Sequence, residues 1–314
     1  MSDKRELFEQ SSQFRHWRYT PSSLSALRAA NNQQGIARVR QSLLAESSLD
    51  GNSARTAEAE NNMLTPADEL GLINYYLQKI RDYATVYKFN STVKATAITF
   101  MKRFYLHNVV FDYPPKGIML ACLYLATKVE NSFVKIDDFT KPLARTKVTN
   151  SDVLDYEFVV TQSLQFDLAV HHPYRPAYGF FLDMQTYVED ITVLQKTYEL
   201  AQKYIDQAVF TDLVFYYQPA QIALGAIKLA AVETRCDVDQ YLTSQFDARA
   251  LESLYPILDN VQEEIRKYQP VSMKEAQVID RKLILCRNPE KNPSSSLYKS
   301  KNPEVPYVSD SDSD

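Results

Sequence analysis

The stretch PPKGIMLACLYLATKVE, residues 114–130, decides the fold of this chain. From Ile118 to Ala126 no residue carries a charge or an amide, and only Tyr124 has a polar end. A helix that is apolar on all sides is normally buried. The two prolines suit the start of a helix, because the amide hydrogen that proline lacks would have no intrahelical partner there. The stretch therefore predicts a buried central helix.

A second copy of this stretch, YQPAQIALGAIKLAAVE, occupies residues 217–233. The matching pairs are Tyr113/Tyr217, Pro115/Pro219, Ile118/Ile222, Leu120/Leu224, Leu125/Leu229 and Ala126/Ala230. Copies separated by about 100 residues indicate a duplicated domain rather than a solenoid, whose repeats span about 20–50 residues. We expect each half of the chain to be a bundle around one such helix.

The composition favours an all-α fold. The chain has only 6 glycines among 314 residues, whereas roughly 7% is typical, and this argues against a turn-rich β fold. The length allows two domains plus extensions, so we predict two tandem five-helix repeats with extra N- and C-terminal helices. With 35 basic and 39 acidic residues the net charge is -4, which indicates neither a nucleic-acid-binding nor a membrane-binding surface.

Changes of pattern along the chain predict five parts. They are a helical extension with a mobile loop (1–62), a first repeat (63–168), a second repeat (169–270), a C-terminal helix (271–288) and a disordered acidic tail (289–314). In the extension, Thr20-Pro21 predicts the start of a short helix, which Trp17 would anchor. Residues 45–62 are polar with few large apolar side chains, which predicts the loop.

Apolar residues at helical spacing predict five helices in each repeat. In the first repeat these span 66–87, 91–108, 114–130, 136–143 and 151–166, the last capped by Thr149; in the second they span 178–188, 193–210, 217–233, 238–246 and 248–268. A terminal helix is predicted over 276–286.

No motif for catalysis, cofactor binding or metal binding occurs in the sequence. The glycines allow no phosphate-binding loop, and G-x-S-x-G, H-E-x-x-H and paired C-x-x-C are missing. Cys122, Cys236 and Cys286 lie far apart, so we expect buried free thiols in a reducing compartment. His171 and His172 have no neighbouring ligand pair and are expected to serve as a linker. Without a signal peptide or membrane-spanning run, a soluble intracellular protein is expected.

One charged residue has an unusual position. Glu157 falls within the apolar stripe formed by Val153, Val160 and Leu164. A buried carboxylate is costly unless it is paired and hydrogen-bonded, and Lys128 is a candidate partner. Two interpretations remain open from the sequence. Glu157 lies at the exposed rim of an imperfect stripe, or the two residues form a polar clamp that holds another protein's backbone.

The sequence resembles the cyclin family. LATKVEN at 125–131 and DYEFVVTQSLQFDL at 155–168 match the family's most distinctive motifs. SSQFRHW at 11–17, FMKRFYLHN at 100–108 and HPYRPAYGF at 172–180 are similar to the cyclin H group, the cyclins of the CDK-activating kinase and of transcription factor TFIIH. The resemblance covers most of residues 11–288 and implies a tandem cyclin fold.

This resemblance implies a non-catalytic regulatory subunit, without a cofactor, that binds a cyclin-dependent kinase catalytic subunit. Lys128 and Glu157 would hydrogen-bond the kinase backbone around its mobile C-helix, and Val129, Phe166 and Leu168 would pack against that helix. Binding would favour the kinase conformation with this helix swung inward. The kinase would act on other CDKs and on the RNA polymerase II C-terminal domain. A RING-type assembly factor and the TFIIH core are the other expected partners, in the nucleus, with no direct contact to nucleic acid or membrane.

The sequence also departs from the cyclin pattern. Other cyclins have a buried Arg–Asp pair between their first two helices, but here Lys102 occupies the Asp position and no matching Arg is found. The M-R-A-I-L docking patch is missing as well, so substrate docking through it is not expected. In the tail, Ser309, Ser311 and Ser313 lie between aspartates and resemble sites for acid-directed kinases. A solubilising end is the other interpretation of the tail.

A TFIIB-like transcription factor core that binds promoter DNA is the alternative function, because it has a similar helical duplication. Such a core is expected to be basic, since phosphate contacts supply much of its affinity, and the net charge of -4 argues against it. An all-α enzyme is a third class, but no nucleophile, metal or phosphate motif supports it.

Overall fold

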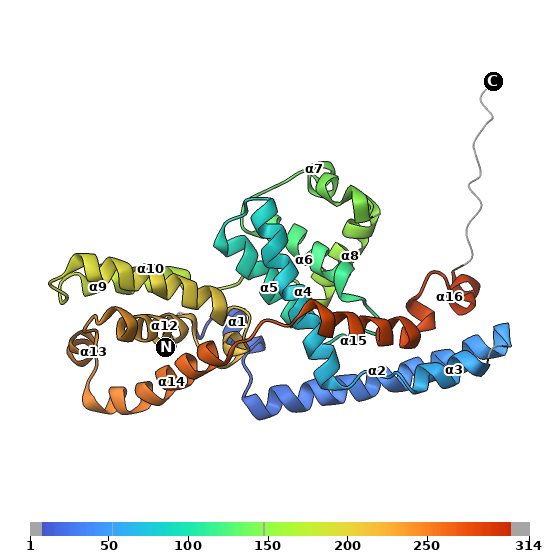
Figure 1. The fold of residues 1–314 in the computed structure, drawn as a ribbon, viewed down its shortest axis with the longest axis horizontal. Helices are drawn as coiled ribbons and strands as arrows, with labels where there is room; N and C mark the ends of the chain where they lie inside the picture. Colours follow the sequence, from blue (N-terminus) through green and yellow to red (C-terminus); the bar gives the residue numbers. More distant parts are fainter. Residues whose placement is uncertain (1–7, 52, 147, 303–314) are drawn as a thin grey trace, which may run out of the picture.

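The computed structural model describes residues 8–51, 53–146 and 148–302, and every regular element within them is a helix. This confirms the predicted all-α class. Figure 1 shows two helical repeats beside each other, with N-terminal and C-terminal helices running together at one side. Each repeat is built around its own cluster of buried apolar side chains.

The predicted central helix of the first repeat is α6 (Pro115–Val129). All of its residues from Ile118 to Thr127 are buried, and it packs against α4, α5 and α8. Gly117 permits the close approach of α8, because a Cβ at this position would lie 2.5 Å from Cε2 of Tyr156. The elements of the repeat are α4 (Pro66–Val86), α5 (Ser91–Phe104), α6, α7 (Ile136–Thr140), the 3-10 turn η1 (Lys141–Thr146) and α8 (Asn150–Ser163).

The second repeat has the same plan around the twin helix α12 (Pro219–Thr234). α12 packs against α9, α10 and α14 and buries most of its side chains, as its apolar sequence predicts. The other elements of the repeat are α9 (Tyr174–Met184), α10 (Ile191–Ala208), α11 (Leu213–Tyr216), α13 (Asp239–Gln245) and α14 (Ala248–Lys267). α9 begins four residues earlier than the sequence predicted.

The N-terminal extension differs from the prediction of a short helix and a mobile loop. It contains α1 (Ser12–His16), the 30-residue α2 (Pro21–Asp50) and α3 (Ser53–Glu60). Thr20 caps α2 as predicted. The loop prediction was wrong because small and charged residues make the contacts here: Ala59 is fully buried, and Arg40 pairs with Glu60 at 2.9 Å.

The C-terminal side also differs from the prediction. α15 (Met273–Cys286) is the expected helix and packs against α3 and α4, but the chain then forms the turn η2 (Pro289–Lys291) and α16 (Ser296–Lys301) on α2. Residues 289–302 are therefore ordered. A buried carboxylate holds them: Glu46 of α2 accepts the amides of Ser296 and Leu297 at 3.0 and 2.6 Å. Ser309, Ser311 and Ser313 lie outside the described residues.

Cys122, Cys236 and Cys286 are buried free thiols, as predicted. In the described part of the chain, no helix combines the length and apolarity that crossing a bilayer would need.

Lys102 joins the two repeats. Its side chain is buried, and its ammonium donates to the carbonyl oxygens of Val209, at 2.8 Å, and Thr211. Val209 is the C-terminal cap of α10, where the helix dipole favours a cation. The lysine at the expected Asp position thus binds the end of a helix in the other repeat.

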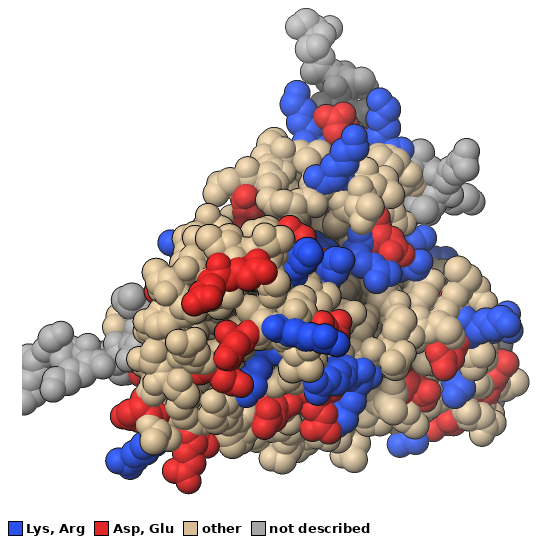
Figure 2. All heavy atoms as spheres, turned by 60° about the vertical axis from the view of Figure 1, so that its left-hand side comes forward, with Lys and Arg blue, Asp and Glu red and all other residues tan. Residues whose placement is uncertain are grey.

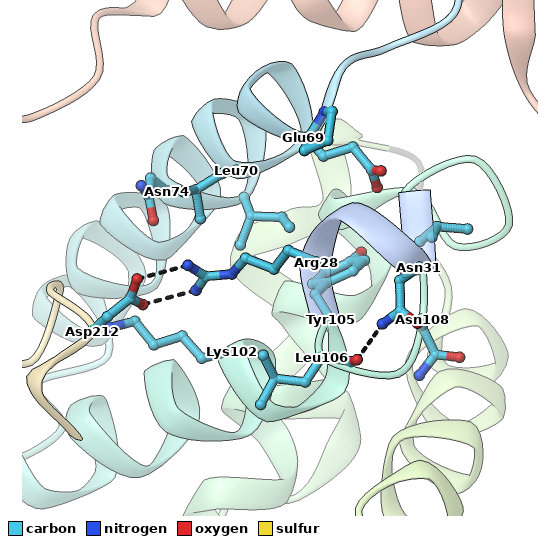
Figure 3. A pocket seen from close by; sticks show the side chains of 13 residues that line it. Arg28, Asn31, Glu69, Leu70, Asn74, Lys102, Tyr105, Leu106, Asn108 and Asp212 are labelled. Atoms are coloured by element: carbon cyan, nitrogen blue, oxygen red, sulfur yellow. Dashed lines mark hydrogen bonds and ion pairs between the residues drawn. The ribbon is translucent and has the colours of Figure 1, made fainter. Parts of the chain in front are cut away.

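An arginine–aspartate pair lies next to this lysine. Arg28 of α2 donates from both terminal nitrogens to Asp212, at 2.7 and 2.8 Å. Figure 3 shows the pair beside Lys102, at a cavity of about 30 Å³. The arginine comes from α2 of the N-terminal extension, and not from the first two helices of the repeat, where other cyclins are expected to have the pair. The resulting junction connects α2, α5 and the second repeat.

Candidate functional site

The predicted partners Lys128 and Glu157 are in contact. Nζ of Lys128 lies 2.7 Å from Oε1 and 2.9 Å from Oε2 of Glu157. The Glu157 side chain is only 13% exposed, whereas that of Lys128 is 36% exposed. The pair therefore lies at the surface with its carboxylate mostly shielded, which favours the paired interpretation over a solvated glutamate at a rim.

The helices α6 and α8 place this pair. Lys128 is in the last turn of α6, where the helix dipole favours a cation, and its Nζ lies 4.5 Å from the centroid of the Tyr124 ring. α8 begins after the predicted cap Thr149, whose hydroxyl accepts the amide of Asp152 at 3.1 Å. The residue at which α8 begins and the packing of α8 on α6 together place Glu157 beside the last turn of α6, where Lys128 lies.

The three apolar residues of the predicted site lie at the ends of the same two helices. Val129 is the last residue of α6, and Phe166 and Leu168 follow α8. Val129 and Leu168 are partly buried against the core of the first repeat, whereas Phe166 is 69% exposed. The structure thus pairs Lys128 with Glu157, seats Val129 and Leu168 on one core, and leaves Phe166 projecting into solvent.

Two further exposed apolar residues lie on α8 and were not among the residues predicted for the site. Leu154 is 41% and Phe158 67% exposed. With Glu157 and Thr161 they have the i, i+3, i+4, i+7 spacing of one helix face, which we call the α8 face. Large exposed apolar patches mark protein contact surfaces, and Leu154 and Phe158 add exposed apolar area on the helix that carries Glu157. The spacing is visible in the sequence, but whether this side of the helix faces solvent depends on how α8 packs.

His171 and His172 lie in the segment that joins α8 to α9, in line with the linker prediction. The hydroxyl of Thr96 donates to Glu130 at 2.6 Å and lies 2.7 Å from Nε2 of His172. Burial lowers the pKa of His172 to about 3, so its ring is neutral at physiological pH. In the three described ranges, no cluster of His, Cys, Asp and Glu side chains could hold a metal ion.

Comparison with known proteins gives two family matches. The cyclin N-terminal domain matches residues 66–169, and the cyclin C-terminal domain matches residues 172–271. These ranges correspond to the two observed repeats.

Individual relatives carry the same family name. The chain is 37% identical to cyclin mcs2 of Schizosaccharomyces pombe, over 93% of this chain and 88% of that protein. It is 32% identical to cyclin-H of Xenopus laevis, over 72% of this chain and 73% of that protein.

Solved structures agree with these relatives. A chain of the CAK complex from Chaetomium thermophilum, solved with ATP-gamma-S, superposes with a TM-score of 0.78 at 26% identity, covering 98% of both chains. A chain of the yeast TFIIK complex (Kin28/Ccl1/Tfb3) superposes with a TM-score of 0.66 at 31% identity, covering 82% of this chain and 99% of that one. Both domain models match, and the sequence identity to these relatives extends over most of their length. The chain therefore belongs to the cyclin family, in its cyclin H group.

Proposed function

We propose that the chain is a non-catalytic regulatory subunit that binds and allosterically activates a cyclin-dependent kinase of the CDK-activating, TFIIH-associated type. The similarity to chains of the CAK and TFIIK complexes supports the kinase class. The observation that carries the proposal is the Lys128–Glu157 pair at the ends of two packed helices, next to the exposed α8 face.

The chemistry of this surface suits a protein backbone. An ammonium offers three donors and a carboxylate several acceptor positions, so the pair can bind carbonyl and amide groups that a kinase helix leaves unpaired at its ends. Val129, Leu168 and the exposed ring of Phe166 supply apolar contact. A cyclin that binds one position of the kinase helix better than the other shifts the population toward that position by its difference in affinity. The Lys–Glu pair that orients ATP then forms within the kinase.

We extend the proposal to the wider assembly. The kinase would phosphorylate other CDKs and the RNA polymerase II C-terminal domain, with a RING-type assembly factor and the TFIIH core as additional partners, in the nucleus. The three components named for yeast TFIIK support a complex with more than two subunits.

The charge distribution favours a protein partner over promoter DNA. The net charge is -4, and Figure 2 shows acidic side chains among the basic ones on the face that includes the second repeat. A promoter-binding core needs phosphate contacts from a basic surface. These observations favour kinase regulation over the TFIIB-like alternative.

Purification tests the proposal directly. The chain is isolated from its native source, the co-purifying protein kinase is identified, and that catalytic subunit is assayed on a peptide of the polymerase C-terminal domain with and without added chain. We expect phosphorylation to rise on addition of the chain. If no kinase co-purifies, or if the isolated kinase does not respond, the proposal is wrong.

A further inference from the structure

The turn that carries Phe166 has an unusual backbone. Gln165 and Phe166 both have positive φ angles, of 53° and 61°, which are disfavoured for residues with a bulky side chain. The ring of Phe166 is 69% exposed, so its own burial does not offset this strain. Strained backbone persists where surrounding contacts determine it, and such positions cluster at binding sites. Backbone hydrogen bonds close the turn after α8, from the amides of Phe166 and Asp167 to the carbonyl oxygens of Thr161 and Leu164 at 3.1 and 2.9 Å. Contacts from other segments add to them.

Asp167, the next residue, is held by a segment from the other end of the sequence. We call residues 12–18 the N-terminal strap. His16 Nδ1 lies 2.6 Å from Oδ2 of Asp167, and Trp17 Nε1 donates to the same oxygen at 3.3 Å. Burial by itself would raise the pKa of Asp167, but hydrogen bonds from His16, Ser12 and Trp17 lower it overall. The carboxylate is therefore ionised at physiological pH and hydrogen-bonded to the strap.

Arg103 of α5 holds the backbone of the same residue. Its Nη1 donates to the carbonyl oxygen of Asp167 at 3.1 Å, and its guanidinium carbon lies 4.8 Å from the centroid of the Trp17 ring. Arg103 and Trp17 are 1% and 3% exposed. Burial lowers the pKa of Arg103 to about 10, which still leaves it charged at physiological pH. Both the side chain and the carbonyl of Asp167 are thus fixed.

The strap itself is tied to both repeats. The Gln13 side chain accepts the amide of His171 at 2.7 Å and donates to its carbonyl at 3.3 Å, in the segment between the repeats. Arg18 donates to the carbonyl of Tyr216 at 2.6 Å, in the second repeat. The position of the strap against Asp167 is therefore set by the whole fold rather than by the first repeat alone.

We propose that His16, Trp17 and Arg103 are positioning residues, which hold residues 165–168 in the strained conformation that presents Phe166 and Leu168 to the kinase. The inference rests on the proposed function, because it assigns the strap to the same binding surface. It predicts that a change in the strap weakens kinase binding mainly through Phe166, because its side chain is more exposed than that of Leu168, and not through general loss of folding.

A double-mutant cycle separates these two routes. The full chain and its His16→Ala, Phe166→Ala and double variants are titrated with the kinase catalytic subunit that co-purifies with the chain. We expect His16→Ala to raise the Kd about fivefold in the native background but less than about twofold in the Phe166→Ala background. Hydrogen exchange should show faster exchange at residues 165–168 in His16→Ala. Asp167→Asn, which keeps the side-chain shape, should behave in the same way.

The control is Arg40→Ala, which breaks an exposed ion pair with Glu60 elsewhere in the extension and should leave the Kd unchanged. An equal loss of affinity in both backgrounds, or no loss in either, would overturn the positioning role while leaving the kinase-binding surface intact. If Phe166→Ala itself has no effect, the positioning role fails with it. The Lys128 and Glu157 variants then decide separately whether the surface binds the kinase.

Discussion

Nζ of Lys128 and Oε1 of Glu157 lie 2.7 Å apart, although 29 positions separate the two residues in the chain. α8 packs on α6, with Tyr156 close to Gly117 near the start of α6 and Glu157 at Lys128 in its last turn. In the twin helix α12, the position that corresponds to Lys128 is Val232, which is 65% exposed. The duplication therefore produced two similar bundles, of which the first has the charged residue that this pair requires.

The α8 face gives a first prediction. Phe158→Asp should weaken binding of the kinase catalytic subunit by about 30-fold or more, because central aromatic contacts contribute about 2 kcal/mol or more to an interface. Phe158 is 67% exposed, so the free energy of unfolding should change by no more than about 0.5 kcal/mol. Calorimetric titration and urea unfolding measure the two quantities. The matched control is Val232→Asp in the second repeat, and equal affinities for both variants would argue against the assigned face.

Lys102 gives a pH-dependent prediction. Burial lowers the pKa of Lys102 from 10.5 to about 7. Between these values the unfolded chain binds more protons than the folded chain, so the free energy of unfolding rises with pH, by at most about 1.4 kcal/mol per pH unit. Below about pH 7 both states are protonated and this contribution is constant. Lys102→Met should remove the rise. Urea unfolding at a series of pH values tests this, and parallel curves for the two proteins would contradict it.

Asp167 should contribute in the acid range. Its lowered pKa means that its stabilisation is fully present above the unfolded pKa of 3.8 and is lost as the pH falls through the lower folded value. Asp167→Asn should therefore reduce the free energy of unfolding near pH 6 and have a smaller effect near pH 3, by chemical denaturation. A difference that stays constant over this range would show that the ionised carboxylate is not the stabilising group.

Glu46 should control the C-terminal helix. Removing its carboxylate leaves the amides of Ser296 and Leu297 without their acceptor, at a cost of about 1–3 kcal/mol for buried groups. In Glu46→Ala, amide hydrogen exchange in α16 should accelerate while exchange in α6 stays unchanged. Glu60→Ala removes an exposed carboxylate and serves as the control. Unchanged exchange in α16 would mean that other contacts hold this helix.

The sequence was most informative where periodicity and burial agree. The all-apolar stretches of α6 and α12 predicted two bundles, and the position of Glu157 within an apolar stripe made Lys128 a candidate partner, with which it is in contact. Both predictions were possible because helical spacing determines which side chains share a face, and the apolar pattern is pronounced in these segments.

The features that the sequence did not show depend on contacts between distant segments. Glu46 orders α16 from 250 positions away, and Asp167 is bound by His16 from 151 positions away. Residues 45–62 and 289–302 have the polar composition of mobile chain. Their helices are held by capping and charge pairing, and such contacts leave no periodic apolar pattern in the sequence. The junction of Lys102 with Arg28 and Asp212 was not predicted either, because it is made by charged side chains from distant segments.

Kinase activation by a chain without the charged pair tests the central claim most directly. The full chain and its Lys128→Ala/Glu157→Ala variant are compared for affinity to the co-purifying kinase catalytic subunit and for the rate at which each mixture phosphorylates a polymerase C-terminal-domain peptide. Charge-assisted hydrogen bonds contribute about 1.5–3 kcal/mol each, so the Kd should rise by at least about tenfold. Thermal unfolding of the isolated chain should be almost unchanged, since ion pairs at the surface contribute about 0–1 kcal/mol. Full affinity and full activation by the folded variant would contradict the account.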